Sequence, residues 1–323
     1  MKVQTVMKAV QFERYGSPDV LTVRNIPIPA PQQDELLIRV RATSVNPHDV
    51  AVRSGRLRAV SARRFPKGIG LDFAGEVAGS GDLVTGFHVG DRVWGTLPGI
   101  AQTGSGAAAE FVTVNAGRIA HSPANLNHTQ AVSLIAGGTT TITALRDKAG
   151  LTRGDRVLIR GATGGVGSYA VQFAHEAGAH VTALSSSKTT ALAKELGADV
   201  SLDYAVTKPL DLPKYDVVFD TVGSDLRSYR RLLAPGGRMV SIAFGHWRSL
   251  AYVFATSALG SRRIQTFSGS PTTELLTDLT VQAENSTLKP VIDEIYALED
   301  IAAAHWALQA GRGRGGKRVL QID

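Results

Sequence analysis

Two patterns of apolar and polar positions divide the chain. From Lys8 to about Ala120, short apolar segments alternate with polar positions and are separated by Gly and Pro. Residues 36–43 alternate with the period of a half-buried antiparallel strand. Because proline cannot sit in a central strand, the three prolines within 27–31 mark the connection before it. The first part of the chain therefore predicts a compact β structure with many turns.

Near Thr129 the pattern changes to strands that alternate with helices. Residues 157–159 form a short apolar run, as expected for a strand buried on both faces. The amphipathic segment 166–177 follows, and Gly178 is a typical helix C-cap. The sequence predicts further strands at 181–184, 217–219 and 239–243, and helices at 189–196 and 226–233. This order predicts a parallel, doubly wound sheet with right-handed crossovers.

The last sixty residues do not continue this alternation. A helix is predicted around 301–310, then a basic glycine-rich turn and a final strand over 318–322. A chain of 323 residues suggests about two domains of ordinary size. It contains no cysteine, which excludes disulfides, thiolate nucleophiles and zinc sites that use cysteine. Because there is no long apolar run and no apolar leader, we expect a soluble, cytoplasmic protein.

The net charge of +7 could favour an anionic partner. The arginines are densest between Arg53 and Arg64, where no aromatic side chain is available to stack on a base. Nucleic-acid binding is therefore disfavoured. This stretch has two interpretations. The arginines could form a solvated face, or they could attract a phosphorylated substrate such as an acyl-CoA.

A glycine-rich segment between the predicted strand and helix carries the strongest chemical signal. Gly161 is followed by six candidate cofactor-binding residues: Ala162, Thr163, Gly164, Gly165, Val166 and Gly167. Glycines allow the backbone to approach a pyrophosphate, and the helix N-terminus supplies N–H groups and a positive dipole. In its strand–loop–helix setting this segment predicts a dinucleotide site.

The end of the next strand bears on which dinucleotide is bound. NAD-binding folds usually carry an acidic residue there to hold the ribose 2′-hydroxyl. This chain has Ser185, Ser187 and Lys188 instead. Hydroxyls and an ammonium can hold a 2′-phosphate, whereas a carboxylate would repel it. The sequence favours NADPH over NADH, although the serines could also simply cap the next helix.

Several motifs in a fixed order extend this interpretation to the whole chain. They are Asn46-Pro47-His48-Asp49, the segment 70–77, Gly90-Asp91-Arg92-Val93, the segment 109–112, the glycine loop, and 196–204. On these motifs the chain resembles the zinc-free quinone oxidoreductase (zeta-crystallin-like) branch of the medium-chain dehydrogenase/reductase superfamily. The resemblance implies an α/β fold: a GroES-like, β-rich catalytic domain from residues 1–125 and 263–323, and an inserted Rossmann domain, 126–262. It also implies a homodimer.

The resemblance assigns further cofactor contacts. Thr140 is expected to reach the nicotinamide carboxamide, and Lys188 and Tyr204 to flank the 2′-phosphate. Residues at the ends of later strands are expected near the nicotinamide: Val222, Ser241 and Phe244.

Zinc chemistry is not expected. Asn46 stands where the zinc-dependent branch has its first cysteine ligand, and Gly70-Leu71-Asp72 replaces a Gly-His-Glu segment. Without a Lewis acid to polarise an alcohol, alcohol oxidation is disfavoured. Reduction of a polarised alkene or a quinone needs only hydrogen-bond donors and a proton source.

Three residues are the catalytic candidates. Asn46 is expected either to donate its amide N–H to the substrate oxygen or to satisfy a local turn. His48 could supply a proton, or could be a packing or surface histidine. Asp49 is expected to orient neighbouring backbone, with direct proton transfer as the alternative, and Asp72 is expected to be structural.

One departure from the family concerns the substrate side. Relatives often carry tyrosines just after the Asn-Pro motif, but residues 50–58 contain none. Arg53 and Arg58 could replace them with positive charge. Residues 247–259, with Trp247, Tyr252 and Phe254, are expected to line a pocket, pack in the core or form a dimer edge.

The sequence therefore predicts an NADPH-dependent reductase of activated C=C bonds or quinones. A reductase of 2-enoyl thioesters is the alternative enzyme, and a non-catalytic NADPH-binding sensor or structural protein is the alternative from another class.

Overall fold

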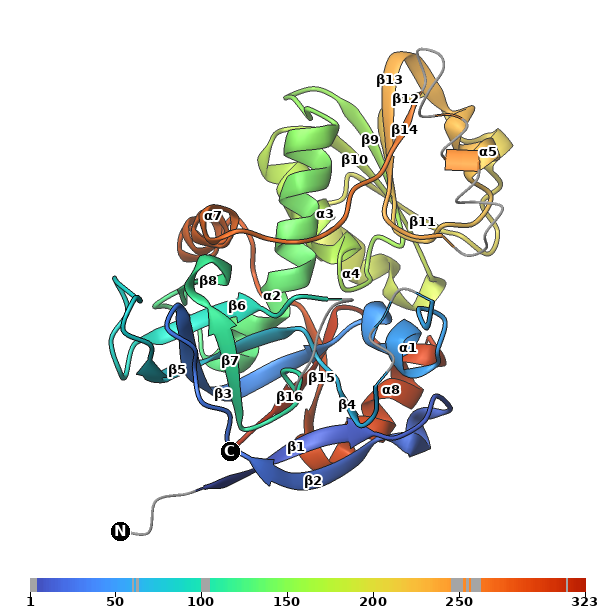
Figure 1. Ribbon diagram of the computed structural model, residues 1–323. Helices are drawn as coiled ribbons and strands as arrows, with labels where there is room; N and C mark the ends of the chain where they lie inside the picture. The colour runs from blue at the N-terminus through green and yellow to red at the C-terminus, as the bar shows by residue number, and fades with distance from the viewer. Residues whose placement is uncertain are drawn as a thin grey trace.

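The computed structural model describes residues 5–59, 61, 64–99, 105–244, 252–253, 256, 263–311 and 313–323. The two ends of the chain, blue to cyan and red in Figure 1, build one β-rich unit together. The middle of the chain builds a second unit around a parallel sheet. The predicted α/β fold, a GroES-like unit with an inserted Rossmann unit, is therefore confirmed.

The described part of the β-rich unit is built from strands in two sheets and the helices α1 and α8. Its elements are β1 (Val6–Phe12), β2 (Thr22–Pro27), β3 (Glu35–Val45), α1 (Pro47–Arg53), β4 (Lys67–Gly68), β5 (Asp72–Ser80), β6 (Arg92–Thr96), β7 (Phe111–Asn115), β8 (Ile119–His121), β15 (Ile292–Ala297), α8 (Ile301–Gln309) and β16 (Lys317–Gln321).

The Rossmann unit contains β9 (Arg156–Arg160), α3 (Gly167–Glu176), β10 (His180–Ser185), α4 (Thr190–Glu195), β11 (Val200–Asp203), β12 (Tyr215–Asp220), α5 (Leu226–Arg230), β13 (Leu233–Ser241) and β14 (Ile264–Gln265). Two further helices are α2 (His128–Thr141), which continues into a π-helical segment (Ile142–Lys148), and α7 (Thr273–Glu284).

The larger sheet of the β-rich unit has the order β15-β16-β3-β5-β6-β8, and β7 also pairs with β3. In β3 the apolar side chains predicted to face inward, Leu36, Ile38 and Val40, are buried, whereas Arg39 is exposed. The C-terminal strand β16 pairs antiparallel with β3, with Arg318 opposite Val45. This pairing brings the start of β16 beside the start of α1.

The parallel sheet has the order β11-β10-β9-β12-β13-β14. Four residues at the carboxyl ends of neighbouring strands lie in one row: Leu184, Arg160, Asp220 and Ser241. In open α/β sheets, ligands bind outside the carboxyl ends of the strands. The row therefore marks the edge of the sheet where a cofactor is expected.

One helix is shorter than the sequence predicts. The predicted helix over 226–233 ends at Arg230, and β13 begins at Leu233 rather than near 239. Gly236 has φ of +75° and lies within β13, next to a register shift between β12 and β13. Residues 235–237 therefore lie within an irregular strand.

Helix α2 packs against strands of the β-rich unit and against α3 of the Rossmann unit. The backbones of α2 and the glycine loop approach closely: a Cβ on Gly137 would lie 2.3 Å from the carbonyl oxygen of Gly165. The predicted domain limits at 125/126 and 262/263 fall before α2 and at the edge of a stretch outside the described residues. They stay a prediction.

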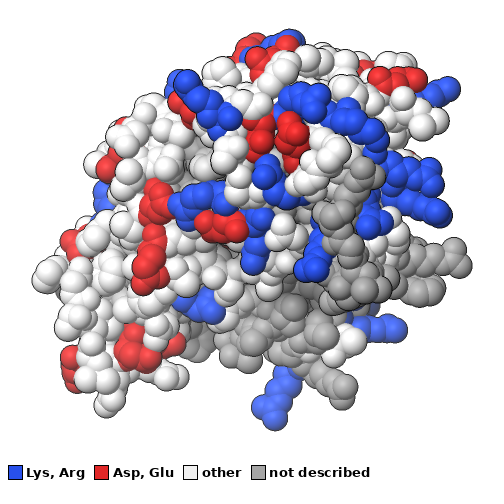
Figure 2. Space-filling model, turned by 90° about the horizontal axis from the view of Figure 1, so that it is seen from above, with Lys and Arg blue, Asp and Glu red and all other residues white. Residues whose placement is uncertain are grey.

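The charged side chains on the face shown in Figure 2 are of both signs. Several arginines of the Rossmann unit pair with carboxylates, such as Arg156 with Asp216 and Arg238 with Asp155. In the described part of the chain, no helix is long and apolar enough to cross a membrane. Of the segment 247–259, Trp247 and Phe254 lie outside the described residues, and Tyr252 packs against the core cluster around Tyr229.

Candidate cofactor and active site

The glycine loop, residues 161–167, joins β9 to α3 and has two tightly packed glycines. Gly161 has φ of +70°, and a Cβ there would lie 2.4 Å from Thr221 Oγ1. A Cβ on Gly167 would lie 2.1 Å from the carbonyl oxygen of Gly161. A Cβ on Gly164, by contrast, would contact only the carbonyl oxygen of Gly161 among the described residues, at 3.3 Å. The loop therefore has a packed base and an open side at the helix N-terminus, which fits a pyrophosphate.

The other loop residues link this site to its surroundings. Ala162 and Thr163 are buried, and Thr163 Oγ1 lies 2.8 Å from Thr189 Oγ1, just beyond the end of β10. Val166 precedes α3, and its carbonyl oxygen accepts a hydrogen bond of 3.4 Å from Thr141 Oγ1 at the end of α2. A Cβ on Gly165 would lie 2.7 Å from Cδ of Lys317. The loop thus contacts both units.

The residues predicted to hold a 2′-phosphate lie together at the ends of β10 and β11. Tyr204 donates its N–H to the carbonyl oxygen of Ser185 at 2.9 Å and is 62% exposed. Ser187 and Lys188 are exposed, whereas Ser185 is buried. Asp203, which belongs to the motif 196–204 but was not predicted to be at the cofactor site, pairs in register with Ser185. Its Oδ1 accepts the N–H of Ala205 at 3.0 Å, so this carboxylate has a local hydrogen-bonding role.

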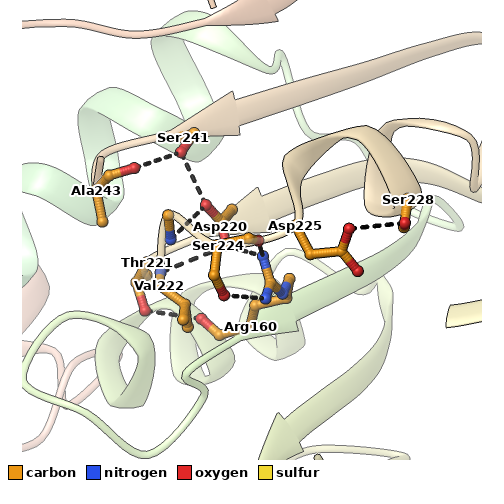
Figure 3. Close-up of polar contacts among 10 residues, drawn as sticks. Arg160, Asp220, Thr221, Val222, Ser224, Asp225, Ser228, Ser241 and Ala243 are labelled. Atoms are coloured by element: carbon orange, nitrogen blue, oxygen red, sulfur yellow. Dashed lines mark hydrogen bonds and ion pairs between the residues drawn. The ribbon is translucent and has the colours of Figure 1, made fainter. Parts of the chain in front are cut away.

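The residues predicted beside the nicotinamide lie at the ends of β12 and β13 (Figure 3). Val222 and Phe244 are partly exposed. Ser241 is buried, and its hydroxyl donates to Asp220 Oδ2 at 2.8 Å. Thr140 is half-buried near the end of α2. The Ser241 hydroxyl is therefore already bonded within the protein, to Asp220 at the end of β12.

Asn46 is the N-cap of α1 and its side chain is buried in a polar cluster. Its Nδ2 donates to Asp72 Oδ2 at 3.0 Å and to Ser44 Oγ at 3.1 Å, which uses both amide hydrogens. Its Oδ1 accepts a hydrogen bond from Lys317 Nζ. The amide is therefore committed within the protein, and its role toward a substrate oxygen stays a prediction.

Asp49 and His48 occupy the first turn of α1. Asp49 Oδ2 accepts the backbone N–H of Asn46 at 2.7 Å, which is the backbone-orienting contact expected of it. His48 Nδ1 lies 3.9 Å from Asp49 Oδ1. Both ring nitrogens of His48 are buried, and neither has a hydrogen-bond partner among the described residues. A Cβ on Gly99 would lie 3.5 Å from Nε2, so the ring faces the segment after β6 that contains Gly99.

Lys317 is a functional candidate that sequence reasoning missed. It begins β16, is 4% exposed, and reaches from the glycine loop to Asn46. Burial lowers the pKa of the Lys317 ammonium, while the Asp72 and Asp49 carboxylates oppose that shift. Burial likewise raises the pKa of the Asp72 carboxyl, against the effects of Lys317, Ser44 and Asn46. The Asp72 carboxylate accepts hydrogen bonds from Ser44 and Asn46, so it has a structural role and also positions the Asn46 amide.

The expectation for Arg53 is wrong. Its guanidinium is fully buried and donates to the carbonyl oxygen of Gly16 and to Gln309 Oε1. Arg53 therefore ties α1 to α8 and presents no charge to a substrate. Arg58 is exposed.

Known proteins share this architecture. Residues 32–124 match the family described as alcohol dehydrogenase GroES-like domain, and residues 196–320 match the family described as zinc-binding dehydrogenase. The 2-methylene-furan-3-one reductase of Solanum lycopersicum is 33% identical over 98% of this chain and 79% of its own.

Solved structures agree. A quinone oxidoreductase from Coxiella burnetii superposes with a TM-score of 0.87 and 30% identity, covering 98% of this chain and 100% of its own. A mycobacterial protein solved in complex with NADPH has a TM-score of 0.83 and 28% identity, with coverage of 98% and 100%.

The fold and the glycine loop define an oxidoreductase that uses a nicotinamide cofactor and acts on a small molecule. The chain belongs to the medium-chain dehydrogenase/reductase superfamily, in its quinone oxidoreductase branch. Within the described ranges, no group of three or more His, Cys, Asp or Glu side chains could hold a metal ion.

Proposed function

We propose that this protein is a zinc-independent, NADPH-dependent reductase of activated C=C bonds or quinones. The observation that carries the proposal is the end of β10, where Ser187 and the Lys188 ammonium are exposed beside Tyr204. A phosphate prefers hydroxyl and ammonium donors. The carboxylate of Asp203, opposite Ser185, accepts a backbone N–H at 3.0 Å. This arrangement supports a 2′-phosphate, hence NADPH.

The cofactor supplies a hydride, and the protein must stabilise charge and deliver a proton. Two groups of the β-rich unit suit these tasks. The Lys317 ammonium adds positive charge beside Asn46 and the glycine loop. His48 has buried ring nitrogens without a hydrogen-bond partner among the described residues, so its ring is available to a substrate as the proton donor. The substrate class follows from the tomato reductase and the Coxiella quinone oxidoreductase that this chain resembles.

The cofactor preference is tested with Lys188→Glu and a matched control, Lys208→Glu. Both replace an exposed lysine of the Rossmann unit and make the same change in net charge. Removing one phosphate contact and adding repulsion is expected to weaken NADPH binding by about 2 kcal/mol, roughly thirtyfold. NADH binding should be unchanged, and Lys208→Glu should leave both within about twofold. Equal losses in the two variants would mean that only overall charge matters.

The substrate class is tested by NADPH oxidation over quinones, α,β-unsaturated ketones and 2-enoyl-CoA thioesters. Turnover of the first two classes supports the proposal. Turnover confined to enoyl-CoA would identify the thioester reductase instead. Tight NADPH binding without turnover of any class would point to a sensor. The cytoplasmic location and the homodimer stay predictions, and light scattering of the purified protein tests the second.

A further inference from the structure

A buried ion pair lies at the carboxyl ends of two central strands. Arg160, the last residue of β9, donates from Nη1 to Oδ1 of Asp220, the last residue of β12, at 2.5 Å. Their side chains are 6% and 0% exposed. Taking two charges out of water is costly, and such a pair often stabilises a fold no better than packed apolar side chains would. A contribution to stability is therefore a weak explanation of this pair.

The pair holds the loop that follows β12 (Figure 3). Asp220 Oδ2 accepts the N–H of Gly223 at 2.9 Å, and Arg160 Nη1 also donates to the carbonyl oxygen of Ser224 at 2.7 Å. Arg160 Nη2 donates to Ser224 Oγ at 3.3 Å. The Val222 N–H lies 3.4 Å from Asp220 Oδ1. One pair of side chains therefore holds residues 222–224 of this loop.

The same carboxylate also holds the end of the neighbouring strand. Asp220 Oδ2 accepts the hydroxyl of Ser241 at 2.8 Å, next to the segment that carries Phe244. Loop and segment are in close contact, since a Cβ on Gly223 would lie 2.4 Å from the carbonyl oxygen of Ala243. Asp220 thus connects two backbone segments that form one wall.

The wall is set against the first residue of the glycine loop. Thr221 Oγ1 donates to the carbonyl oxygen of Arg160 at 2.7 Å, and a Cβ on Gly161 would lie 3.2 Å from Cγ2 of Val222. The guanidinium of Arg160 also lies 3.6 Å from the ring centroid of Tyr229, which fixes its plane from the other side. A shift of Arg160 would therefore displace Val222 relative to the loop that is expected to hold the pyrophosphate.

We propose that Arg160 and Asp220 are positioning residues that fix the Val222 wall against the glycine loop, and so determine how tightly the nicotinamide half of NADPH is bound. This inference rests on the proposed function. The adenosine half would bind at the ends of β10 and β11, away from this wall. Loss of the pair should therefore weaken binding of NADPH but not binding of 2′,5′-ADP, which lacks the nicotinamide.

The test uses two variants. The double variant Arg160→Met, Asp220→Leu removes both charges and leaves no lone buried charge. The conservative variant Arg160→Lys keeps the positive charge but loses the forked guanidinium that reaches Ser224. The matched control is Arg156→Met, Asp216→Leu. That pair joins the same two strands at their other ends, 3.3 Å apart, with side chains 48% and 33% exposed. Dissociation constants are measured for NADPH by nicotinamide fluorescence and for 2′,5′-ADP by calorimetry.

The double variant is expected to bind NADPH about thirtyfold more weakly, and Arg160→Lys about fivefold, with 2′,5′-ADP within about twofold of wild type throughout. The control pair should leave both constants unchanged. Equal weakening of NADPH and 2′,5′-ADP, or NADPH binding within twofold of wild type, would overturn the inference. If the double variant does not fold, Arg160→Lys decides by the same criterion. A wild-type protein that binds no NADPH would instead refute the proposed function.

Discussion

Lys317→Met tests whether the buried ammonium belongs to the polar cluster around Asn46. Methionine keeps most of the apolar stem beside Gly165 and removes the charge. Asp72 then loses its buried positive neighbour and keeps two donors, Ser44 Oγ at 2.6 Å and Asn46 Nδ2 at 3.0 Å. Asn46 Oδ1 loses the donor that Lys317 provides.

The magnitude follows from the burial of the cluster. Lys317 acts on Asp72 through its charge, and Asn46 contacts both side chains. Removing one partner of a directly paired buried ion pair costs about 3–5 kcal/mol, so this indirect arrangement and the two remaining donors on Asp72 favour the lower end. We therefore expect Lys317→Met to reduce the free energy of unfolding by about 3 kcal/mol at pH 7. The exposed pair between Lys8 and Glu299 is the control, since both side chains are about half exposed. Lys8→Met should leave the free energy of unfolding nearly unchanged, because an exposed ion pair contributes little.

The sign of the pH dependence is also fixed. Burial raises the pKa of the Asp72 carboxyl above its unfolded value, and Lys317 opposes that shift. A raised carboxyl pKa gives stability that is present below the unfolded pKa and lost as pH rises through the folded pKa. Without Lys317 the raised pKa is unopposed, so the deficit of the variant relative to wild type should shrink as pH falls below 7.

The assay is urea denaturation followed by far-UV circular dichroism for wild type, Lys317→Met, Asp72→Asn and the double variant. Removing both charges should restore stability to within about 1 kcal/mol of wild type. Additive losses in the double variant, or a deficit that does not change with pH, would refute the coupling of Lys317 to Asp72.

Further predictions concern three other positions. Gly167→Ala places a Cβ 2.1 Å from a backbone carbonyl and should abolish NADPH binding in titrations, whereas Gly269→Ala, with no atom within 4 Å, should leave it unchanged. Burial lowers the pKa of His305 to about 4, with Asp49 raising it and Arg53 lowering it. The unfolded chain therefore binds more protons than the folded protein between pH 4 and 6.5. As pH falls from 6.5 to 4, wild type should lose about 3 kcal/mol of its free energy of unfolding, whereas His305→Gln should not. His48→Asn should lower kcat by about a hundredfold while leaving NADPH affinity unchanged, and an unaltered kcat would remove His48 from proton delivery.

Local patterns in the sequence predicted the parallel sheet and the strand–loop–helix setting of the glycine loop well. The glycines at the strand–helix junction are close together in the sequence, and so are Ser185 through Lys188 at the next strand end. Their relative positions therefore follow from local backbone geometry. The pairing of β16 with β3 was harder to see, because Lys317 meets Asn46 across 271 positions of chain. From the sequence, Lys317 was one more cation in a basic turn.

Charged residues next to apolar runs were the main source of error. Arg160 follows three apolar residues, 157–159. The apolar pattern therefore predicts that the strand ends at Ile159 and leaves Arg160 outside it. Its partner Asp220 lies 60 positions away and becomes adjacent only through the order of the parallel sheet. Arg53 was considered as a positive charge facing the substrate because residues 50–58 lack the tyrosines of relatives, but its side chain turns toward α8.

The most direct test of the proposed function is the transfer of deuterium from NADPH labelled at C4 of the nicotinamide to an α,β-unsaturated ketone, followed by mass spectrometry of the product. NADPH carrying the label on each face of the ring is used in turn. The account predicts a saturated product that carries one deuterium at the β-carbon with one of the two labelled cofactors. Deuterium from NADH at the same rate would contradict the assignment of Ser187 and Lys188, and a product without deuterium from either labelled NADPH would contradict hydride transfer itself.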